Sequence, residues 1–275
     1  MLRTAVMAGV LVMAGCSMAD DSGRDYNPAH QPDYVLPGYG GSSDPAPVPT
    51  WQGSGTGLGL PGIGQAEPSE PDQTVRGGAG YASKPHTFEL ASGADAVRVS
   101  VADLGGDLFD VSAPSRSEVR PTVDVKGTSV VARLGETGNA GPSIVTVLLA
   151  RDVRWQVRLT GGASDEAVDL TGGTLGGDVD LSAGTSRAEV ALPAAAGTQK
   201  VTVNGGASLL TVRLAGTAPV RVAARDGAAN VTIEGQSQSS VANGFLFVPP
   251  SWESAKDRFT IDVTSGVSSL TVARG

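Results

Sequence analysis

The sequence predicts an all-β protein, in which a repetitive solenoid of stacked strands, resembling a β-helix or a rack, spans residues 86–275. A disordered tether rich in glycine and proline precedes it. Three observations predict this fold: apolar residues alternate with polar ones over many short segments, a phrase of about ten residues returns several times, and no segment has helical periodicity. A repeat near 20 residues is typical of stacked units that bury their apolar faces against one another.

Residues 1–15 are predicted to be a lipoprotein signal peptide. Arg3 precedes an apolar run over residues 4–14, which is shorter than the roughly 20 residues that a membrane-spanning helix needs. The run ends in small residues directly before Cys16, the single cysteine of the chain. This arrangement resembles the lipobox of bacterial lipoproteins, which implies that Cys16 is lipid-modified and anchors the chain to the extracytoplasmic face of the cell membrane. The alternative is an incidental cysteine after an ordinary signal peptide.

Residues 16–85 are predicted to be the lipidated cysteine and a disordered linker. Residues 17–85 hold 13 glycines and 10 prolines and show no apolar periodicity. Such a segment buries too little apolar surface to offset the entropy lost on ordering. The stretch from Gly57 to Gly62 matches a dinucleotide-binding pattern in letters, but no strand is predicted before it and no helix after it. We therefore expect no cofactor there.

From residue 86 onward the pattern is that of strands with one buried face. The first clear example is Trp155, Val157 and Leu159, which alternate with polar residues. The same alternation predicts further short strands, at 167–170, 178–181, 188–192, 201–203, 210–214, 220–222, 231–233, 259–263 and 270–272. The last of these is expected to close the stack.

Each repeat has a glycine at its corner. The phrases at 161–170, 183–192, 205–214, 226–235 and 265–274 align through five glycines, with spacings of 22, 22, 21 and 39 residues: Gly162, Gly184, Gly206, Gly227 and Gly266. A tight turn often requires positive φ, which glycine adopts without strain. We therefore predict these glycines to be structural corners, and Gly184→Val to be strongly destabilising.

An insertion at residues 236–257 interrupts the repeat and contains Phe245, Phe247 and Trp252. Insertions in repeat arrays map to loops on one face, often the binding face, so these aromatic residues are candidate partner contacts. The alternative, which we favour, is that they cap the open end of the stack and block edge-to-edge pairing.

The sequence is poor in catalytic groups. With two histidines, His30 in the tether and His86 at the edge of the repeats, it offers no zinc ligand set and no basis for a Ser-His-Asp triad, so we predict no metal site and no catalytic residue. Carboxylates recur in successive repeats and interleave with arginines, which predicts ladders of ion pairs on the outer faces in preference to a calcium site or a glycosidase. They are Asp165, Glu166, Asp169, Asp178, Asp180 and Glu189. A net charge of −8 argues against nucleic acid as a partner.

The repeated segments resemble the toast-rack domains of bacterial envelope proteins, which include the C-terminal region of LiaF-type proteins. The resemblance spans about residues 86–275 and rests on DVRWQVRLTGGASDEAVDL (152–170), KVTVNGGASLLTVRL (200–214) and their neighbours. The chain is also similar to adhesin-like β-solenoid heads. The resemblance implies an extracytoplasmic β-stack, in some members linked to envelope stress, and it supplies no catalytic residues.

The expected function is that of a non-catalytic interaction or structural module of a lipid-anchored envelope protein. The expected partners are membrane lipid, through acylated Cys16, and an envelope protein or cell-wall glycan. One alternative is an accessory sensor or modulator of an envelope-stress signalling system. A less favoured one is an enzyme that acts on polysaccharide, which would need two carboxylates in a groove.

Overall fold

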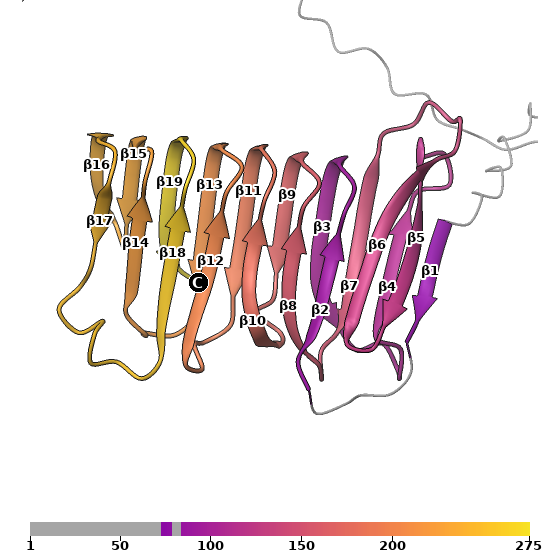
Figure 1. The fold of residues 1–275 in the computed structure, drawn as a ribbon, viewed down its shortest axis with the longest axis horizontal. Coiled ribbons are helices and arrows are strands. Elements are labelled where there is room, and N and C mark those ends of the chain that lie inside the picture. The colour runs from indigo at the N-terminus through magenta and orange to yellow at the C-terminus, as the bar shows by residue number, and fades with distance from the viewer. Residues whose placement is uncertain (1–72, 79–83) are drawn as a thin grey trace, which may run out of the picture. The chain divides into compact units, whose positions relative to one another are not determined.

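The computed structural model describes residues 73–78 and 84–275, which form nineteen strands in two sheets and contain no helix. The predicted all-β fold of stacked strands is therefore confirmed (Figure 1). The ten strands of sheet A are, in spatial order, β1 (Gln73–Gly77), β4 (Phe109–Ala113), β7 (Ile144–Ala150), β3 (Ala94–Ala102), β9 (Ala163–Asp169), β11 (Thr185–Leu192), β13 (Ala207–Leu214), β19 (Val267–Arg274), β15 (Ala228–Ile233) and β16 (Gln236–Val241).

Sheet B faces sheet A across the core and has nine strands. In spatial order they are β17 (Phe245–Phe247), β14 (Val220–Ala224), β18 (Arg258–Val263), β12 (Thr198–Val203), β10 (Thr174–Leu181), β8 (Arg154–Leu159), β2 (His86–Leu90), β6 (Ser129–Glu136) and β5 (Val119–Lys126). None of the residues that the structure describes belongs to a helix long and apolar enough to cross a bilayer.

The repeating unit is a rung, which we define as one strand of sheet B, a corner, and the following strand of sheet A. Successive rungs pair in parallel, so that residues one repeat apart lie side by side: Val157 pairs with Val179, and Val179 with Val201. A chain that advances 22 residues per rung places every apolar position of one rung beside the same position of the next. The sequence repeat is therefore the rung itself.

The core between the sheets is built from columns of inward-facing side chains. One column of sheet A is aliphatic in seven successive strands and fully buried: Val147, Val99, Val168, Val190, Val212, Val272 and Ile233. β-Branched residues suit this position because they pack well on a pleated surface. Trp155 is buried at the start of β8, where its indole N–H donates to the carbonyl of Ala150 over 2.9 Å.

The order of the rungs in space differs from their order in the sequence. The rung β18–β19 lies between β12–β13 and β14–β15, and the rung β2–β3 lies between β6–β7 and β8–β9. The prediction that the last strand closes the stack is therefore wrong, because β19 is an internal strand paired on both sides. The apolar pattern is the same in every rung, so it specifies a rung without specifying its place.

Both ends of the stack are formed by antiparallel strands that follow parallel ones. At one end β4 pairs with β7 and β5 with β6, while at the other end β16 pairs with β15 and β17 with β14. The turn from β15 to β16 uses Glu234 and Gly235, both at positive φ, which is the two-residue hairpin geometry that fits the twist of a sheet. The predicted insertion thus supplies one strand to the end of each sheet.

The sheet begins earlier than residue 86, the predicted start of the repeat domain. Strand β1 lies within the predicted linker and pairs with β4 along its whole length. Val75 packs against the hydrophobic core and Arg76 forms a 2.5 Å ion pair with Asp110. Composition does not reveal this strand, because its five residues lie within a segment rich in glycine and proline. The predicted signal peptide, Cys16 and most of the linker lie outside the described residues.

Candidate functional site

The corners form a continuous row along one edge of the stack, and this row is the first candidate site. Each corner extends the hydrogen-bond ladder of sheet B, because its first residue donates to the last strand residue of the neighbouring rung. Ser182 N–H donates to Leu159 C=O, and Asn204 N–H to Leu181 C=O, each over 2.8 Å. The corners are therefore held as firmly as the strands that they connect.

Two glycines that the sequence comparison did not single out allow the corners to stack closely. A Cβ atom at Gly161 would lie 2.1 Å from the carbonyl carbon of Ser92, and one at Gly205 would lie 1.9 Å from that of Ala183. Both distances are far inside van der Waals contact with rigid backbone. Glycine thus alternates along this row with residues that carry a side chain: Ser92, Gly161, Ala183, Gly205 and Ser265.

The predicted reason for the aligned glycines holds at one position and is wrong at the others. Gly227 has φ of 77°, whereas Gly162, Gly184, Gly206 and Gly266 are absent from the positive-φ region. In the rungs that hold these four, the chain bends at the residue before the glycine, without positive φ: Gly161, Ala183, Gly205 and Ser265. The expected severe effect of Gly184→Val accordingly loses its basis, since a Cβ there would lie 3.8 Å from the carbonyl oxygen of Gly206.

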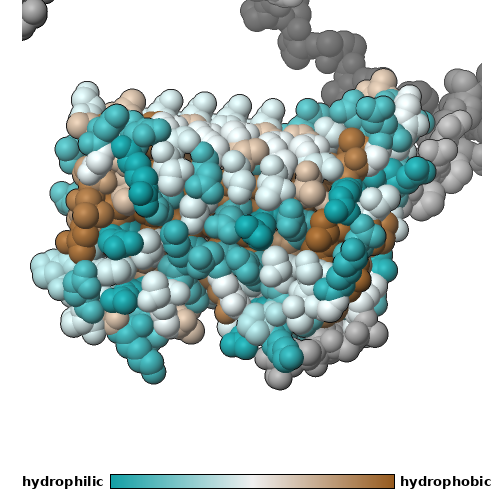
Figure 2. Space-filling model, in the orientation of Figure 1, coloured by the Kyte–Doolittle hydropathy of each residue, from teal (hydrophilic) through white to brown (hydrophobic). Residues whose placement is uncertain are grey.

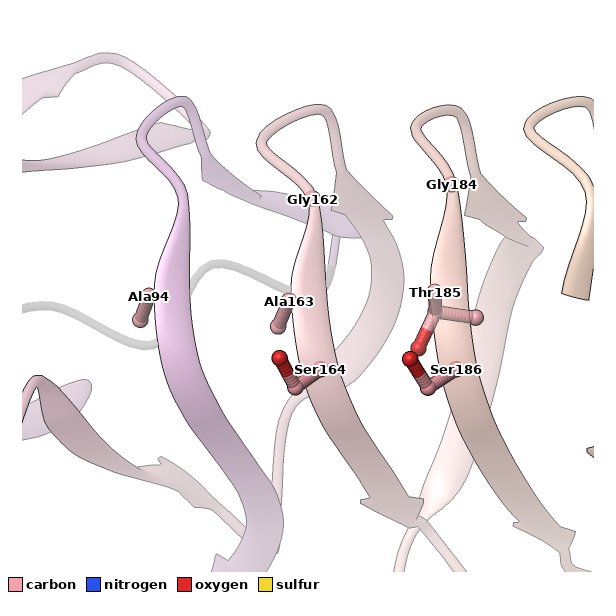
Figure 3. Close-up of a pocket in the computed structure, with 7 residues that line it drawn as sticks. All are labelled: Ala94, Gly162, Ala163, Ser164, Gly184, Thr185 and Ser186. Carbon is pink, nitrogen blue, oxygen red and sulfur yellow. The ribbon is translucent and has the colours of Figure 1, made fainter. Parts of the chain in front are cut away.

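A shallow depression of about 380 Å³ lies on three successive corners (Figure 3). Its floor consists of Ala94, Ala163 and Thr185, which occupy the same place on β3, β9 and β11, and the hydroxyls of Ser164 and Ser186 point the same way beside it. Its remaining lining residues are the backbone at Gly162 and Gly184. No residue that lines the depression has a titratable side chain, so the depression offers hydrogen bonds without acid, base or activated nucleophile.

The corner row differs from the rest of this face in polarity. In Figure 2 the edge formed by the corners is nearly neutral in hydropathy, whereas strongly hydrophilic side chains gather lower on the face. Ser164, Ser186, Ser208 and Ser268 repeat at one exposed position of successive strands. These four positions form a regular run of small hydroxyl groups, which ends at the equivalent residue of β3, the exposed Asp95.

The second candidate site is the end formed by the insertion. Phe245 and Phe247 pair with Ala224 and Val222 on β14 and pack against the core from its open end while remaining partly exposed. They occupy the position of a cap, and their exposed parts remain available to a partner.

Trp252, the third predicted contact residue, is not brought to this surface. It is buried, its indole N–H donates to the Phe259 carbonyl over 2.8 Å, and the guanidinium groups of Arg221 and Arg258 lie 4.6 Å and 4.3 Å from the ring centroid. Such cation–π contacts are stabilising when the groups are desolvated. Trp252 thus fixes the segment after β17 to sheet B.

The predicted ion-pair ladders are present on the outer faces. On sheet A, Asp165 pairs with Arg98 over 2.6 Å and Glu189 pairs with Arg213; on sheet B, Asp180 lies 3.6 Å from Arg158. The side chain of Asp169 accepts hydrogen bonds from Thr171, in its own turn. Exposed pairs of this kind each stabilise a protein by roughly 0.2–1 kcal/mol.

Asp178 lies on the same outer face of sheet B. Partial burial, with the neighbouring charge of Asp180, raises the pKa of this carboxyl, and Lys200 opposes the rise. Across residues 73–78 and 84–275, no three metal-ligating side chains gather closely enough to hold an ion.

Glu166 is the exception among the predicted carboxylates, because it faces the core. It occupies an otherwise aliphatic column of sheet A, between Val97 and Ala188, and is 1% exposed with Oε2 lacking a hydrogen-bond partner. Burial raises the pKa of this carboxyl from 4.5 to about 7, while a backbone hydrogen bond from Ala163 opposes the rise. Alignment of the repeats contains the signal for this residue, since the equivalent positions are Ala188, Leu210, Leu270 and Val231.

His86 is also internal. It is 2% exposed, its Nδ1 lies 3.1 Å from the Lys84 carbonyl oxygen, and its ring is tilted against Trp155 with centroids 5.7 Å apart. A histidine enclosed in this way packs as a core residue and is not placed to transfer protons to a ligand.

Asp262 is a buried carboxylate on sheet B that pairs with an exposed arginine. Arg225 binds both of its oxygens through Nε and Nη2, over 2.9 Å and 2.8 Å, and Lys200 lies 3.8 Å away. The hydrogen bonds from Arg225 lower the pKa of this carboxyl, against the effect of burial. The pair joins the corner after β14 to the internal strand β18.

We expect Arg225→Gln to lower the free energy of unfolding at pH 7, because it leaves a largely buried carboxylate without its main partner. A lowered native pKa contributes stability above the ordinary value of 3.8, and that contribution is lost as the pH falls through the native value. The difference from wild type should thus shrink in urea titrations near pH 3. Arg133→Gln is the control, since its partner Asp124 is exposed; equal losses in both variants would contradict the expectation.

Comparison with known proteins shows a shared fold but assigns the chain to no family. No family model matches the sequence, and no curated protein matches it. Among solved structures, the chain is similar to a candidate cell adhesion protein from Clostridium sporogenes, with 13% sequence identity and a TM-score of 0.54, over 74% of this chain and 100% of that one. This likeness shows a shared all-β stacked fold.

A second solved structure, a candidate adhesin from Bacteroides fragilis, aligns with 9% identity over 74% of this chain and 98% of the other. Its TM-score of 0.21 is too low to support an argument about the fold. The conclusion that the fold is shared therefore rests on the first structure alone.

Proposed function

We propose that this chain is a lipid-anchored, non-catalytic binding head, which acts as an adhesin-like module on the outer side of the bacterial cell membrane. The observation that supports this best is the fold itself, a rigid rack of stacked strands that spans the whole length of a candidate adhesion protein. Most enzymes place reactive groups in a concave pocket, whereas the depression on the corners is shallow and lined by Gly, Ala, Ser and Thr.

The regular surface of the rack suits binding to an extended or repetitive ligand. Corner hydroxyls repeat in four neighbouring rungs, at Ser164, Ser186, Ser208 and Ser268, and neighbouring strands are spaced about 4.8 Å apart. Cell-wall glycan is a ligand of this kind, because its hydroxyl and amide groups also repeat along a chain. The proposed kinship with toast-rack heads of the cell envelope rests on the repeated glycines and alternating valines of segments such as 200–214.

The test of the proposed function is adherence. Bacteria that display the protein should adhere to immobilised cell-wall glycan, and adherence should fall severalfold when the corner serines are replaced together, in Ser164→Asp and Ser186→Asp. The matched control is Thr122→Asp, which replaces an exposed hydroxyl on β5, away from the corners and from β16. Equal adherence of all three strains, or of a strain that lacks the protein, would contradict the proposal.

Anchoring is tested separately through Cys16. We expect Cys16→Ser to move the protein from the membrane fraction to the soluble fraction and to abolish labelling by a radioactive fatty acid, because two or more acyl chains are what makes such anchoring stable. The readouts are fractionation and lipid labelling. An unlabelled wild-type protein that still sediments with membranes would exclude the lipid anchor while leaving the binding head intact.

A further inference from the structure

The end of the stack formed by β16 and β17 presents two strand edges at once. β16 is the outermost strand of sheet A and β17 is the outermost strand of sheet B, and both lie at the end opposite β1 (Figure 1). Alternate residues of an antiparallel strand hydrogen-bond to the neighbouring strand, so half of the backbone groups of β16 point away from β15. An exposed edge of this kind is a template for pairing with another chain.

The longer edge strand at this end, β16, lacks the usual protection against pairing, whereas β17 is only three residues long and is followed closely by Pro249 and Pro250. Proteins block exposed edges with lysine, proline or inward-pointing charges, and β16 contains Gln, Ser and Val alone, with five of its six side chains exposed. Residues 235–252 include no charged side chain. Two copies can therefore approach each other at this end without bringing like charges together.

The opposite end is protected. Its outer strand in sheet B, β5, carries Arg120, Pro121, Asp124 and Lys126. The outer edges of the two sheets are also offset there. β1 extends sheet A by one strand beyond the last strand of sheet B, so that sheet A has ten strands and sheet B has nine. The difference between the two ends points to the β16–β17 end as the surface for association.

Apolar side chains on β17 and at Val248, the residue after it, add to the uncharged edge. Leu246 is 60% exposed and Val248 is 39% exposed, and Phe245 and Phe247 are only partly covered. Figure 2 shows hydrophobic surface at this end of the stack. Removing such side chains from water favours association.

We propose that two copies of this chain associate end to end through β16 and β17, as a dimer with a two-fold axis normal to the sheets. That axis sets β16 against β16 of the second copy and β17 against β17, so that both edges are satisfied together. An extended peptide can cover one edge, whereas only another two-sheet stack fits both. A two-fold contact closes on itself and yields a finite dimer. The inference does not depend on the proposed function or on the anchor.

Cross-linking of the full chain tests the arrangement. Single cysteines at Gln236, Ser237, Gln238 and Ser239, in a Cys16→Ser background, should give dimers with a short bis-maleimide linker, with the highest yield where the residue lies opposite its own copy near the axis. Lys126→Cys, on the edge strand β5 at the other end, is the control and should give none. Equal cross-linking at Lys126 would overturn the proposal.

A charge test separates association from folding. We expect Ser237→Lys to raise the dimer dissociation constant at least tenfold in sedimentation velocity, and an equimolar mixture with Ser237→Glu to restore the dimer, because the two copies then present opposite charges across the contact between the two β16 strands. Thr122→Lys, an equivalent change on exposed β5, should leave association unchanged. A wild-type chain that sediments as a monomer up to about 100 μM, or variants that do not recover on mixing, would overturn the proposal.

Discussion

Replacing Gly205 by alanine should destabilise the protein by about 3 kcal/mol or more, which corresponds to a fall in Tm of about 10 °C for a domain of this size. The new Cβ would lie 1.9 Å from the carbonyl carbon of Ala183. Relief requires a shift of backbone, and the corner backbone is fixed by hydrogen bonds to both neighbouring rungs, such as that from Asn204 N–H to Leu181 C=O. Thermal unfolding followed by circular dichroism measures the effect.

Gly184→Ala is the matched control, because it adds the same atom to a corner one rung away. Its Cβ would meet the Gly206 carbonyl oxygen at 3.8 Å, an ordinary contact, and its φ lies outside the positive region. An alanine that fits the native backbone restricts the unfolded chain, so this variant should equal the wild type or gain up to about 1 kcal/mol. If both variants lost stability equally, close stacking would not be the reason for glycine at position 205.

The second large effect is a dependence of stability on pH that comes from Glu166. Because the native pKa is raised to about 7 from 4.5, the native state binds more protons than the unfolded state between these values. The contribution to stability is therefore complete below pH 4.5 and is lost as the pH rises through about 7. The loss amounts to about 3 kcal/mol.

Glu166→Leu should remove this slope and leave the protein more stable than the wild type at pH 8. Leucine fits the column, because Leu210 and Leu270 occupy it on β13 and β19. Urea titrations at pH 5 and pH 8 measure the difference, and Glu166→Gln serves as the control that keeps the shape and a polar head but does not titrate. A wild type whose stability changes with pH no more than that of Glu166→Gln would disprove the buried charge.

The sequence is sufficient for the kind of fold because every rung repeats the same alternation. Val157 and Val179 lie inside for the same reason and pair directly. The order of the rungs is a different matter. In the sheet, β18 lies between β12 and β14, although it follows both in the sequence. Its apolar pattern does not specify this place, because Ile261 pairs in the same way with Val201 on β12 and with Val222 on β14.

In the candidate sites, too, some features follow from a single repeat and others depend on how the rungs are arranged in space. Asp165 and Arg98 are 67 residues apart in the sequence, and they pair only because β9 and β3 are neighbours in the sheet. The role of Gly205 depends on how close two corners approach, a distance that no single repeat contains. Glu166, by contrast, is visible in the aligned repeats as an acid in an aliphatic column, although its position was predicted to face outward.

The internal position of β18 and β19 has a consequence for the timing of folding. A ribosome makes β14, β15, β16 and β17 before residues 258–274, yet in the finished stack the rung β14–β15 touches β12–β13 only through the rung that is made last. Until then the nascent chain carries two unjoined parts, one ending at the rung β12–β13 and a smaller one formed by β14, β15, β16 and β17, each with an unpaired strand edge open to wrong partners. We expect the last seventeen residues of this region to join the two parts in a single late step, which makes the newly made chain dependent on a chaperone or on rapid completion.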